Sequence, residues 1–456
     1  MSNQKRQMIL ATFIHNSGSH PGGWRYPQSG PVDQHDFGHY ARLAQKAEQG
    51  KLHVYFSGDS QGFPHIKGKD AFATTDYAGK LEPTTLLAAL AAVTSQIGLV
   101  ATVSTTFNEP YSIARRFASL DHISNGRIGW NVVTSTGSIE ARNFGFDEIM
   151  DHDRRYDRAE EFVNVVRNLW DSWEDGSITR DAASGRYFDP EMVHQLNHAG
   201  EFFKVAGPLN VARPPQGHPV IVQAGGSPAG RALAARTADM IFTAQNELSG
   251  AKDFYKDMKS RAKGFGRNPD NLKVIPSVQF IIGGTEAEAS RKQEELLELI
   301  PEALALQTLQ VQIGADLSHC SPDDYLPEIP KTEGGQWVQD QIVKMARDEN
   351  LRIGELAKRV VVSRASLIRS GTPEQIADFC AEWFTEGAAD GFSVTPNYLP
   401  DNLEEFIDQV VPILQKRGLF RTDYEGGTLR ENIGLERPEN SFVNDPALGC
   451  EPRIWQ

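Results

Sequence analysis

The sequence predicts an α/β protein folded as a (β/α)8 barrel, for three reasons. The chain has 456 residues, which is enough for one large barrel with insertions. Short apolar segments alternate with longer segments of helical periodicity, and eight such units follow one another. No internal repeat or low-complexity segment is visible. Eight parallel units suit a closed barrel better than the alternative, an open doubly wound sheet.

The expected strands are apolar runs that stop at glycine or at polar residues. The seventh is expected despite its internal Pro276, because the residues around it are apolar and β-branched. The eight strands are predicted at 8–13, 52–56, 97–104, 128–134, 219–224, 240–244, 273–282 and 391–395.

The expected helices show start and stop signals as well as periodicity. Pro83 and Pro228 stand at first-turn positions, and Gly50 and the Asn125-Gly126 pair follow helix ends. The helices are predicted at 36–49, 83–96, 111–123, 153–173, 228–238, 248–263, 372–386 and 403–417.

Two segments break the alternation and are interpreted as insertions in a single domain that spans 1–456. Residues 174–218, after the fourth strand, are rich in Gly, Pro, Asp and His, and residues 285–371, after the seventh strand, are expected to be helical and charged. The C-terminal tail, 418–456, is polar and unlike a core element, so we expect it to lie outside the core and to be able to pack across a neighbouring subunit.

Composition excludes several classes of function. Lys and Arg number 46 against 60 Asp and Glu, a net charge of −14, which argues against a general nucleic-acid or anionic-membrane binder. No run of about 18 apolar residues is present, so no transmembrane helix is expected. The N-terminal apolar run is interrupted by Thr12 and is interpreted as a strand rather than a signal peptide.

Cysteine and histidine patterns indicate neither a disulfide framework nor a metal centre. The three cysteines are widely spaced, which favours a reducing cytoplasm. The pairs His35/His39 and His194/His198 have i,i+4 spacing, but zinc would need a third ligand, and we expect no metal site.

Polar residues gather where the predicted strands end, which is where active sites of such barrels lie. They are Asp59, Thr102, Ser104, Thr105, Thr106, Asn131, Thr134, Ser135, Gln223, Thr243 and Gln245, followed in the loops by His152 and Tyr156. Any one of them is compatible with ordinary loop polarity. Taken together they favour a bound polar ligand, because buried polar groups without partners are costly.

The segment from Gly225 to Pro228 has the chemistry of a phosphate site. Two glycines allow a tight turn, Ser227 is a favourable N-cap, and the helix that follows exposes N–H groups at its start. A turn between a strand and a helix with no bound ligand explains the same residues equally well.

Several signatures are missing, and their absence narrows the alternatives. No GxGxxG follows a strand, and neither GxxxxGK[ST] nor GxSxG occurs. A metal-assisted hydrolase would need three or more convergent ligands, and only Asp59 and His152 stand out. A ligand-binding protein without turnover is the other class of alternative.

Long motifs resemble the flavin-dependent monooxygenases of the bacterial-luciferase superfamily, in its nitrilotriacetate and dibenzothiophene-sulfone monooxygenase branch. The resemblance covers nearly the full chain, and the aminopolycarboxylate-type members are the most similar. The motifs are GGWRYP (22–27), FNEPYSIARRFASLDHISNGR (107–127), WNVVTS (130–135), EARNFG (140–145), HDRRYDRAEEF (152–162), FFKVAGPLN (202–210), the run 207–239, EGAADGFSVTPNYLP (386–400) and RGLFRTDYEGGTLRENIGL (417–435).

The resemblance implies a barrel that uses FMN, reduced to FMNH2 by a separate NAD(P)H:flavin reductase, with O2 as co-substrate. One oxygen atom would enter a small substrate beside a heteroatom, and C–N or C–S cleavage would follow. A homodimer or tetramer is also implied. A deazaflavin-dependent dehydrogenase is an alternative within the superfamily, as are sulfone-type and S-succinylcysteine-type substrates.

The flavin contacts of the family fall on residues that this sequence shares. They are Asp59, Thr102, Asn131, His152, Tyr156, Gly226 and Ser227, with Tyr156, Gly226 and Ser227 at the phosphate and His152 as a candidate acid or base. The sequence departs from the family at Ser57-Gly58-Asp59, which stands where a bulkier hydrophobic residue and Ala or Pro usually precede Asp. This departure is expected to enlarge the pocket beside the flavin ring and to alter substrate choice. Four basic residues in the first two loops are hypothetical carboxylate-binding groups, although solvent-exposed side chains are as good an explanation: Arg25, His65, Lys67 and Lys69.

Overall fold

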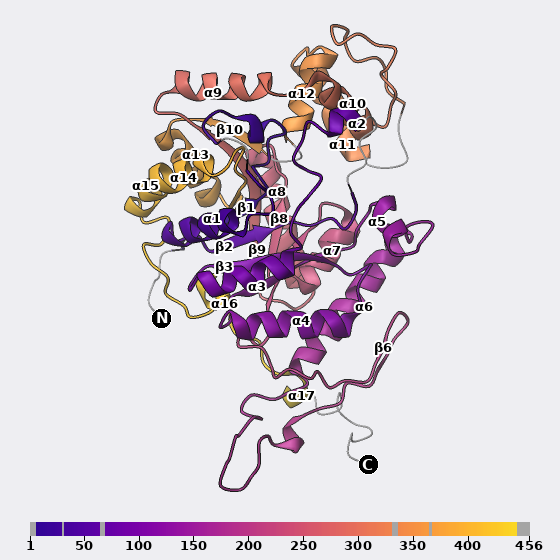
Figure 1. Ribbon diagram of the computed structural model, residues 1–456, viewed down its shortest axis with the longest axis vertical. Helices are drawn as coiled ribbons and strands as arrows, with labels where there is room; N and C mark the ends of the chain where they lie inside the picture. Colours follow the sequence, from indigo (N-terminus) through magenta and orange to yellow (C-terminus); the bar gives the residue numbers. More distant parts are fainter. Residues whose placement is uncertain (1–5, 30–31, 64–68, 331–335, 364–366, 445–456) are drawn as a thin grey trace.

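The computed structural model describes residues 6–29, 32–63, 69–330, 336–363 and 367–444 (Figure 1). Its centre is a closed barrel of eight parallel strands, which confirms the predicted fold class. Closure comes from β9, which pairs with β8 on one side and with β11 on the other. The barrel strands are β1 (Ile9–Ile14), β2 (Val54–Ser57), β3 (Gly98–Ser104), β4 (Ile128–Val133), β7 (Val220–Ala224), β8 (Met240–Thr243), β9 (Lys273–Ile282) and β11 (Gly391–Val394). All eight predicted strands are present.

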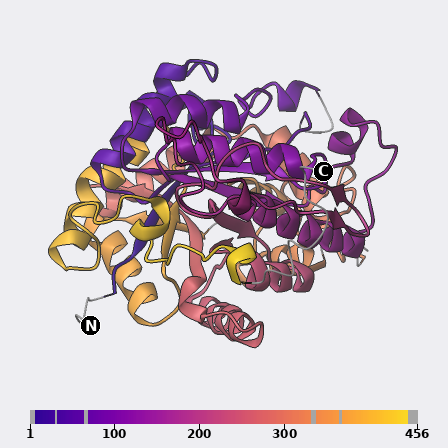
Figure 2. The same cartoon turned by 90° about the horizontal axis from the view of Figure 1, so that it is seen from below.

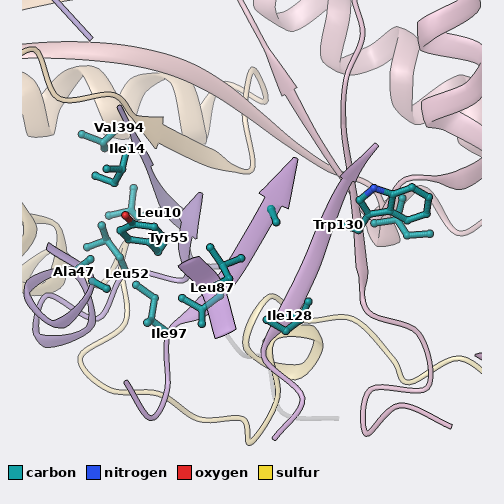
Figure 3. Close-up of a cluster of buried hydrophobic side chains, with 14 of the residues drawn as sticks. Leu10, Ile14, Ala47, Leu52, Tyr55, Leu87, Ile97, Ile128, Trp130 and Val394 are labelled. Atoms are coloured by element: carbon teal, nitrogen blue, oxygen red, sulfur yellow. The ribbon is translucent and has the colours of Figure 1, made fainter. Parts of the chain in front are cut away.

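Alternate residues of each strand separate the barrel interior from the layer beneath the helices. The interior cluster includes Ala11, Phe56, Val100 and Val222, all of them buried. The outward-facing residues form a second, larger core with the helices, and Figure 3 shows part of this core around Leu10, Tyr55, Leu87 and Ile97. The interior becomes polar toward the carboxyl ends of the strands, where Thr102 and Asn131 replace aliphatic residues.

Helices surround the strands (Figure 2). Several begin at a side chain that accepts a hydrogen bond from the first turn, as Asp36, Glu82, Ser227 and Thr372 do. The helices that follow barrel strands are α1 (Phe37–Gln49), α3 (Pro83–Val93), α4 (Pro110–Ile123), α5 (Ser138–Asn143), α6 (His152–Asp171), α7 (Pro228–Thr237), α8 (Leu248–Gly264), α13 (Pro373–Thr385), α14 (Asp401–Glu405) and α15 (Val411–Lys416).

Two predicted helices differ from the structure. The helix predicted to reach residue 96 ends at Val93, because Thr94 is extended and its hydroxyl donates to the Leu90 carbonyl instead. The helix predicted over 403–417 is interrupted by a π-helical turn at Phe406–Val410. That turn precedes Pro412, which lacks the N–H that a regular helix would use there.

The segment after β9 forms a lobe with its own apolar core. It contains α9 (Glu286–Glu298), α10 (Glu302–Ile313), α11 (Gln336–Asp348) and α12 (Ile353–Ser363). Ala71 of α2 (Lys69–Phe72) packs into that core, so the loop after β2 and this lobe lie together, as Figure 1 shows for α2 and α10. The expectation of a purely helical segment is wrong at its end, because β10 (Leu367–Gly371) pairs with the second half of the long β9.

The segment after α6 extends to the end of the molecule opposite the lobe of α9 to α12 (Figure 1). It carries one small antiparallel pair, β5 (His198–Ala199) with β6 (Lys204–Val205). Among the residues that the structure describes, no helix is both long enough and apolar enough to span a membrane.

The C-terminal tail is part of the core, and the prediction that it is not was wrong for the described residues up to 444. It contains α16 (Leu429–Asn432) and α17 (Ser441–Asn444). Leu429, Ile433 and Leu435 are buried in the interior cluster of the barrel. These three apolar residues have polar neighbours in the sequence, so the average hydropathy of the tail did not indicate that they are buried. The i,i+4 spacing of Leu429 and Ile433, which places them on one helix face, was the available signal.

Candidate active site

A cavity of about 1160 Å³ opens at the carboxyl ends of the barrel strands. This volume slightly exceeds that of typical ligand pockets, so a cofactor and a substrate can be accommodated together. The cavity brings together residues predicted at the ends of five different strands. They are Asp59, Thr102, Asn131, Gly225, Gly226, Ser227, Thr243 and Gln245.

Other polar residues predicted at strand ends satisfy one another away from the cavity. The Ser135 hydroxyl donates to Ser104 Oγ at 2.9 Å, and the Thr106 hydroxyl donates to the Thr134 carbonyl at 2.5 Å. Gln223 points outward toward Thr237. For these residues, hydrogen bonds within the protein account for the polar side chains without a ligand.

Asn131 and Thr102 provide an unsatisfied polar atom in the barrel wall. Asn131 Nδ2 donates to Thr102 Oγ1 at 2.9 Å, while buried Asn131 Oδ1 accepts no hydrogen bond from the described residues. A buried acceptor without a donor costs about 1–3 kcal/mol. A ligand with an N–H group, such as the ring of a flavin, would satisfy it.

The turn between β7 and α7 has the geometry of a phosphate cradle. A Cβ on Gly226 would meet no atom within 4 Å, whereas one on Gly225 would lie 3.0 Å from the backbone of Gly230. The backbone at Gly226 is therefore open to a ligand, and the turn at Gly225 packs tightly against α7. Ser227 Oγ accepts from Gly230 N–H at 3.1 Å and fixes the start of the helix.

Two arginines add positive charge to this end of the cavity. Arg231 Nε donates to the Gly226 carbonyl at 3.0 Å, and Arg261 Nε donates to Asp257 Oδ1 at 2.8 Å. Both arginines line the cavity and share Asp257 as a partner. Their charges and the dipole of α7 favour an anion such as a phosphate group.

Tyr156 lies beside the phosphate cradle, and His152 lies beside Tyr156. The hydroxyl oxygens of Tyr156 and Ser227 are 3.5 Å apart, and the His152 ring centre is 5.0 Å from that of Tyr156. Neither Tyr156 nor His152 is among the residues that line the cavity. The His152 side chain is 49% exposed, and its Nδ1 lies 2.8 Å from Asp153 Oδ1.

Asp59 forms an ion pair that its position in the sequence did not reveal. Lys80 Nζ lies 3.1 Å from Asp59 Oδ1, and both residues line the cavity. Burial raises the pKa of Asp59, and the Lys80 ammonium opposes that shift. Lys80 therefore favours the charged form of the Asp59 carboxyl group.

Of the four basic residues predicted to bind carboxylates, Arg25 is the one whose side chain the structure describes. Arg25 is exposed, donates to the Leu299 carbonyl and does not line the cavity. His65 and Lys67 lie outside the described residues, and Lys69 begins α2. Lys80 is the cation that lines the cavity on the β1–β2 side among the described residues.

The Phe13 ring fills the space that a side chain on residue 58 would take. A Cβ at this position would lie 2.6 Å from Cε2 and Cζ of Phe13. The Phe13 ring thus occupies the space that the missing side chain leaves. The expectation from Ser57-Gly58-Asp59 did not include Phe13, which the neighbouring strands β1 and β2 place beside Gly58.

The two histidine pairs have protein partners. His39 Nε2 lies 2.9 Å from the Asn16 carbonyl, and His194 and His198 lie within 2.9 Å of Glu174 and Glu161 respectively. Among the described residues, no group of three or more His, Cys, Asp or Glu side chains could hold a metal ion.

Sequence reasoning missed side chains that reach the cavity from β1, from the loops after β1 and β2, and from α7 and α8. The missed lining residues include Phe13, His15, Asn16, Asp76, Tyr77, Lys80, Arg231 and Arg261. A search for basic residues in the whole second loop would have included Lys80. The i,i+4 spacing of Ser227 and Arg231 would have pointed to the arginine at the start of α7.

Comparison with known proteins assigns the family. The luciferase-like monooxygenase family model matches residues 9–390. The chain is 51% identical over 448 residues to nitrilotriacetate monooxygenase component A of Aminobacter aminovorans, covering 96% of this chain and 98% of that protein. It is 47% identical over 447 residues to N-acetyl-S-(2-succino)cysteine monooxygenase of Bacillus subtilis (strain 168), covering 97% and 100%.

A solved structure is similar over nearly the whole chain. Riboflavin lyase RcaE, crystallised with modified FMN and riboflavin, is 33% identical and superposes with a TM-score of 0.85 over 97% of this chain and 99% of that one. The matching model and these relatives span nearly the whole chain, including the strand ends and α7 that shape the cavity. The chain therefore belongs to the luciferase-like monooxygenase family and is a flavin-dependent monooxygenase.

Proposed function

We propose that this enzyme oxygenates a small amine that carries carboxymethyl arms, using O2 and FMN that a separate NAD(P)H:flavin reductase has reduced. The observation that carries the proposal is that one cavity has cationic residues on two separate sides, each suited to a different anionic group. One end is the phosphate cradle of β7 and α7, and the other is the β1–β2 side with Lys80. The 51% identity to nitrilotriacetate monooxygenase component A supports both the substrate class and a second component.

The residues present fit FMN at the first end. Gly226, Ser227 and Tyr156 would hold the phosphate, with Arg231 and Arg261 supplying positive charge, while Thr102 and Asn131 would face the ring. Reduced flavin supplies two electrons to O2, and the protein must exclude water from that chemistry. The stacked rings of Phe13, Phe56 and Phe242 give the cavity an apolar wall, with ring centres 4.6 and 4.7 Å apart.

The residues at the second end would orient the substrate. Lys80 would bind a carboxylate, exchanging part of its pairing with Asp59 for the substrate. One oxygen atom of O2 hydroxylates the carbon between nitrogen and carboxylate, and the other leaves as water. The C–N bond of that product then breaks, which gives a secondary amine and a 2-oxo acid. His152 remains a proposed flavin-site residue through Tyr156 rather than through the cavity.

A thioether substrate is the second candidate, favoured by the 47% identity to N-acetyl-S-(2-succino)cysteine monooxygenase. The same residues would serve it, because a succinyl group carries two carboxylates next to sulfur. Hydroxylation of the carbon attached to sulfur and cleavage of the C–S bond would release a thiol and a 2-oxo dicarboxylate.

The first experiment is an anaerobic titration of the protein with FMN reduced chemically, followed by rapid mixing with oxygenated buffer and each candidate substrate. We expect tight binding of reduced FMN, and oxygen-dependent cleavage of nitrilotriacetate detected by mass spectrometry. Cleavage of the succinylated thioether alone would select the second candidate. Binding without oxygenation of any compound would indicate a flavin carrier or a dehydrogenase, and absence of flavin binding would overturn the proposal.

Assembly and location are further proposals that rest on the resemblance. We propose a homodimer or tetramer, which light scattering would test against the monomer mass of 50.4 kDa. We also propose the reducing cytoplasm, supported by Cys320 and Cys380, which are free thiols among the described residues.

A further inference from the structure

Phe13 and Gly58 form a contact that depends on residue 58 having no side chain. A methyl group on Gly58 would sit 2.6 Å from two ring carbons of Phe13, about 1 Å closer than carbon atoms normally approach. The position of the Phe13 ring is thus determined by Gly58. Residues 13 and 58 belong to adjacent parallel stretches, since Phe13 pairs with Phe56 in the barrel register.

The Phe13 ring has little freedom to retreat elsewhere in the wall. It stacks on Phe56 with ring centres 4.6 Å apart, and it makes an edge contact with the His15 ring at a centre-to-centre distance of 4.3 Å. Phe56 in turn stacks on Phe242 across the barrel at 4.7 Å. A larger residue at position 58 would therefore displace Phe13 toward the open cavity, because its other neighbours are packed rings.

The pair lies on the side of the cavity that the phosphate cradle leaves free. In the closed strand order β1 stands opposite β7, and β2 stands opposite β8. Gly58 precedes Asp59, which pairs with Lys80, and all three line the cavity with Phe13. The wall that Phe13 forms is thus next to the proposed carboxylate-binding group.

We propose that the Gly58–Phe13 contact sets the size of substrate that fits beside Asp59 and Lys80. With glycine at 58 the ring lies back against β2, and this end of the cavity accepts a branched, carboxylate-bearing arm. This inference rests on the proposed function, because it assigns the β1–β2 side to the substrate and the β7–α7 side to the flavin.

The test compares Gly58→Ala, Phe13→Leu and the double variant with the wild-type enzyme. The probes are nitrilotriacetate and the bulkier ethylenediaminetetraacetate, with kcat/KM measured for turnover and Kd by calorimetry. Gly264→Ala is the matched control, because its added methyl would meet no atom within 4 Å. Quenching of FMN fluorescence reports flavin affinity in every variant.

We expect Gly58→Ala to lower the ratio of kcat/KM for the larger over the smaller probe about tenfold, the scale of a methyl-sized change in a pocket. Phe13→Leu should raise that ratio, and the double variant should return it to within about threefold of wild type. The Kd for FMN should stay within about twofold throughout, because neither residue lies at the phosphate cradle.

Two outcomes would overturn the inference and differ from failure of the proposed function. The inference is excluded if Gly58→Ala leaves the ratio of kcat/KM for the larger over the smaller probe unchanged. It is also excluded if the substitution changes the Kd for FMN but not this ratio. Binding of the probes without turnover would refute the proposed reaction, and the ratio of Kd values would still decide the role of the pair. A wild-type protein that binds neither probe would overturn both proposals.

Discussion

Arg430 of the C-terminal tail donates from Nη2 to Asp239 Oδ2 at 2.7 Å, and both side chains are buried at the amino-terminal end of the barrel. Asp239 immediately precedes β8, and its Oδ2 also accepts from the Ile221 N–H at 2.9 Å. Charges of Arg430 and Arg167 lower the pKa of Asp239 against the effect of burial, which raises it. The tail thereby holds two barrel strands together through one carboxylate.

Replacing Arg430 with alanine should destabilise the protein by about 3–5 kcal/mol, because it leaves the buried Asp239 carboxylate without its main partner. Urea unfolding followed by fluorescence measures the change. Arg437→Ala is the matched control in the same tail, since Arg437 pairs with the half-exposed Asp175 and its loss should cost about 1 kcal/mol or less. Equal effects of the two variants would show that the tail is not anchored through Asp239.

Tyr156→Phe should weaken FMN binding about tenfold, the loss expected for one hydrogen bond to a charged phosphate. Equilibrium quenching of FMN fluorescence gives the Kd. Tyr187→Phe, on the exposed segment after α6, is the control and should leave the Kd unchanged. An unaltered Kd for Tyr156→Phe would remove this hydroxyl from the phosphate site despite its 3.5 Å distance to Ser227 Oγ.

His152→Ala should raise the Kd for FMN a few-fold while kcat at saturating flavin stays near the wild-type value. The reason is that His152 contacts Tyr156 at a ring distance of 5.0 Å but does not line the cavity. The pH profile of kcat separates the two roles proposed for this residue. Loss of one limb of that profile in the variant would assign proton transfer to His152 instead of positioning.

Lys80→Met should raise the KM for nitrilotriacetate about tenfold, in keeping with the loss of a charged hydrogen bond, and should leave the Kd for FMN unchanged. Because the Lys80 ammonium opposes the rise of the Asp59 pKa, the variant should also move any acidic limb of kcat/KM to higher pH. Lys80→Arg keeps the charge and should preserve most of the affinity. A KM that is equally raised in both variants would point to shape rather than charge.

His20 gives a prediction for stability at mildly acidic pH. Burial lowers its pKa from 6.5 to about 3, so the folded protein keeps it neutral while the unfolded chain takes up a proton below pH 6.5. A lowered histidine pKa contributes stability above pH 6.5 that is lost as the pH falls toward 3. At pH 5 the loss is about 2 kcal/mol.

The measurement is the free energy of unfolding of wild type and His20→Asn at pH 7.5 and pH 5. Asparagine offers an acceptor in place of Nδ1, which receives the Gly22 N–H at 3.1 Å. The wild type should lose about 2 kcal/mol more than the variant between the two values. His35 has an exposed ring, so His35→Asn is the control and should lose as much free energy of unfolding between the two pH values as the wild type does. The same loss in His20→Asn as in wild type would contradict the assignment.

The sequence was sufficient for elements whose signals are local and strong. The strand at 273–282 matches β9 at both ends, and Ser227 with Pro228 marks the start of α7. Asp59, Thr102 and Asn131 could be predicted as site residues because parallel strands bring their carboxyl ends to one place whatever the loops do. Gly226 and Ser227 could be predicted as site residues for the same reason, and also because Ser227 is a favourable N-cap for the helix that follows.

Other features depend on contacts between distant segments. Lys80 reaches the cavity from a loop 21 residues after its partner Asp59, and no period or cap in the sequence marks it. Leu429 belongs to a polar tail, yet it is buried in the barrel interior. Its side chain lies against Gly98, where the missing side chain of glycine leaves room for it. The residues next to Leu429 in the sequence do not reveal this space. The sequence by itself determined the barrel, the family and the strand-end polar residues, because periodicity, caps and motifs act within short stretches. Only the tertiary structure decided that Phe13 fills the space at Gly58, since that contact exists between side chains on two strands and in neither strand alone.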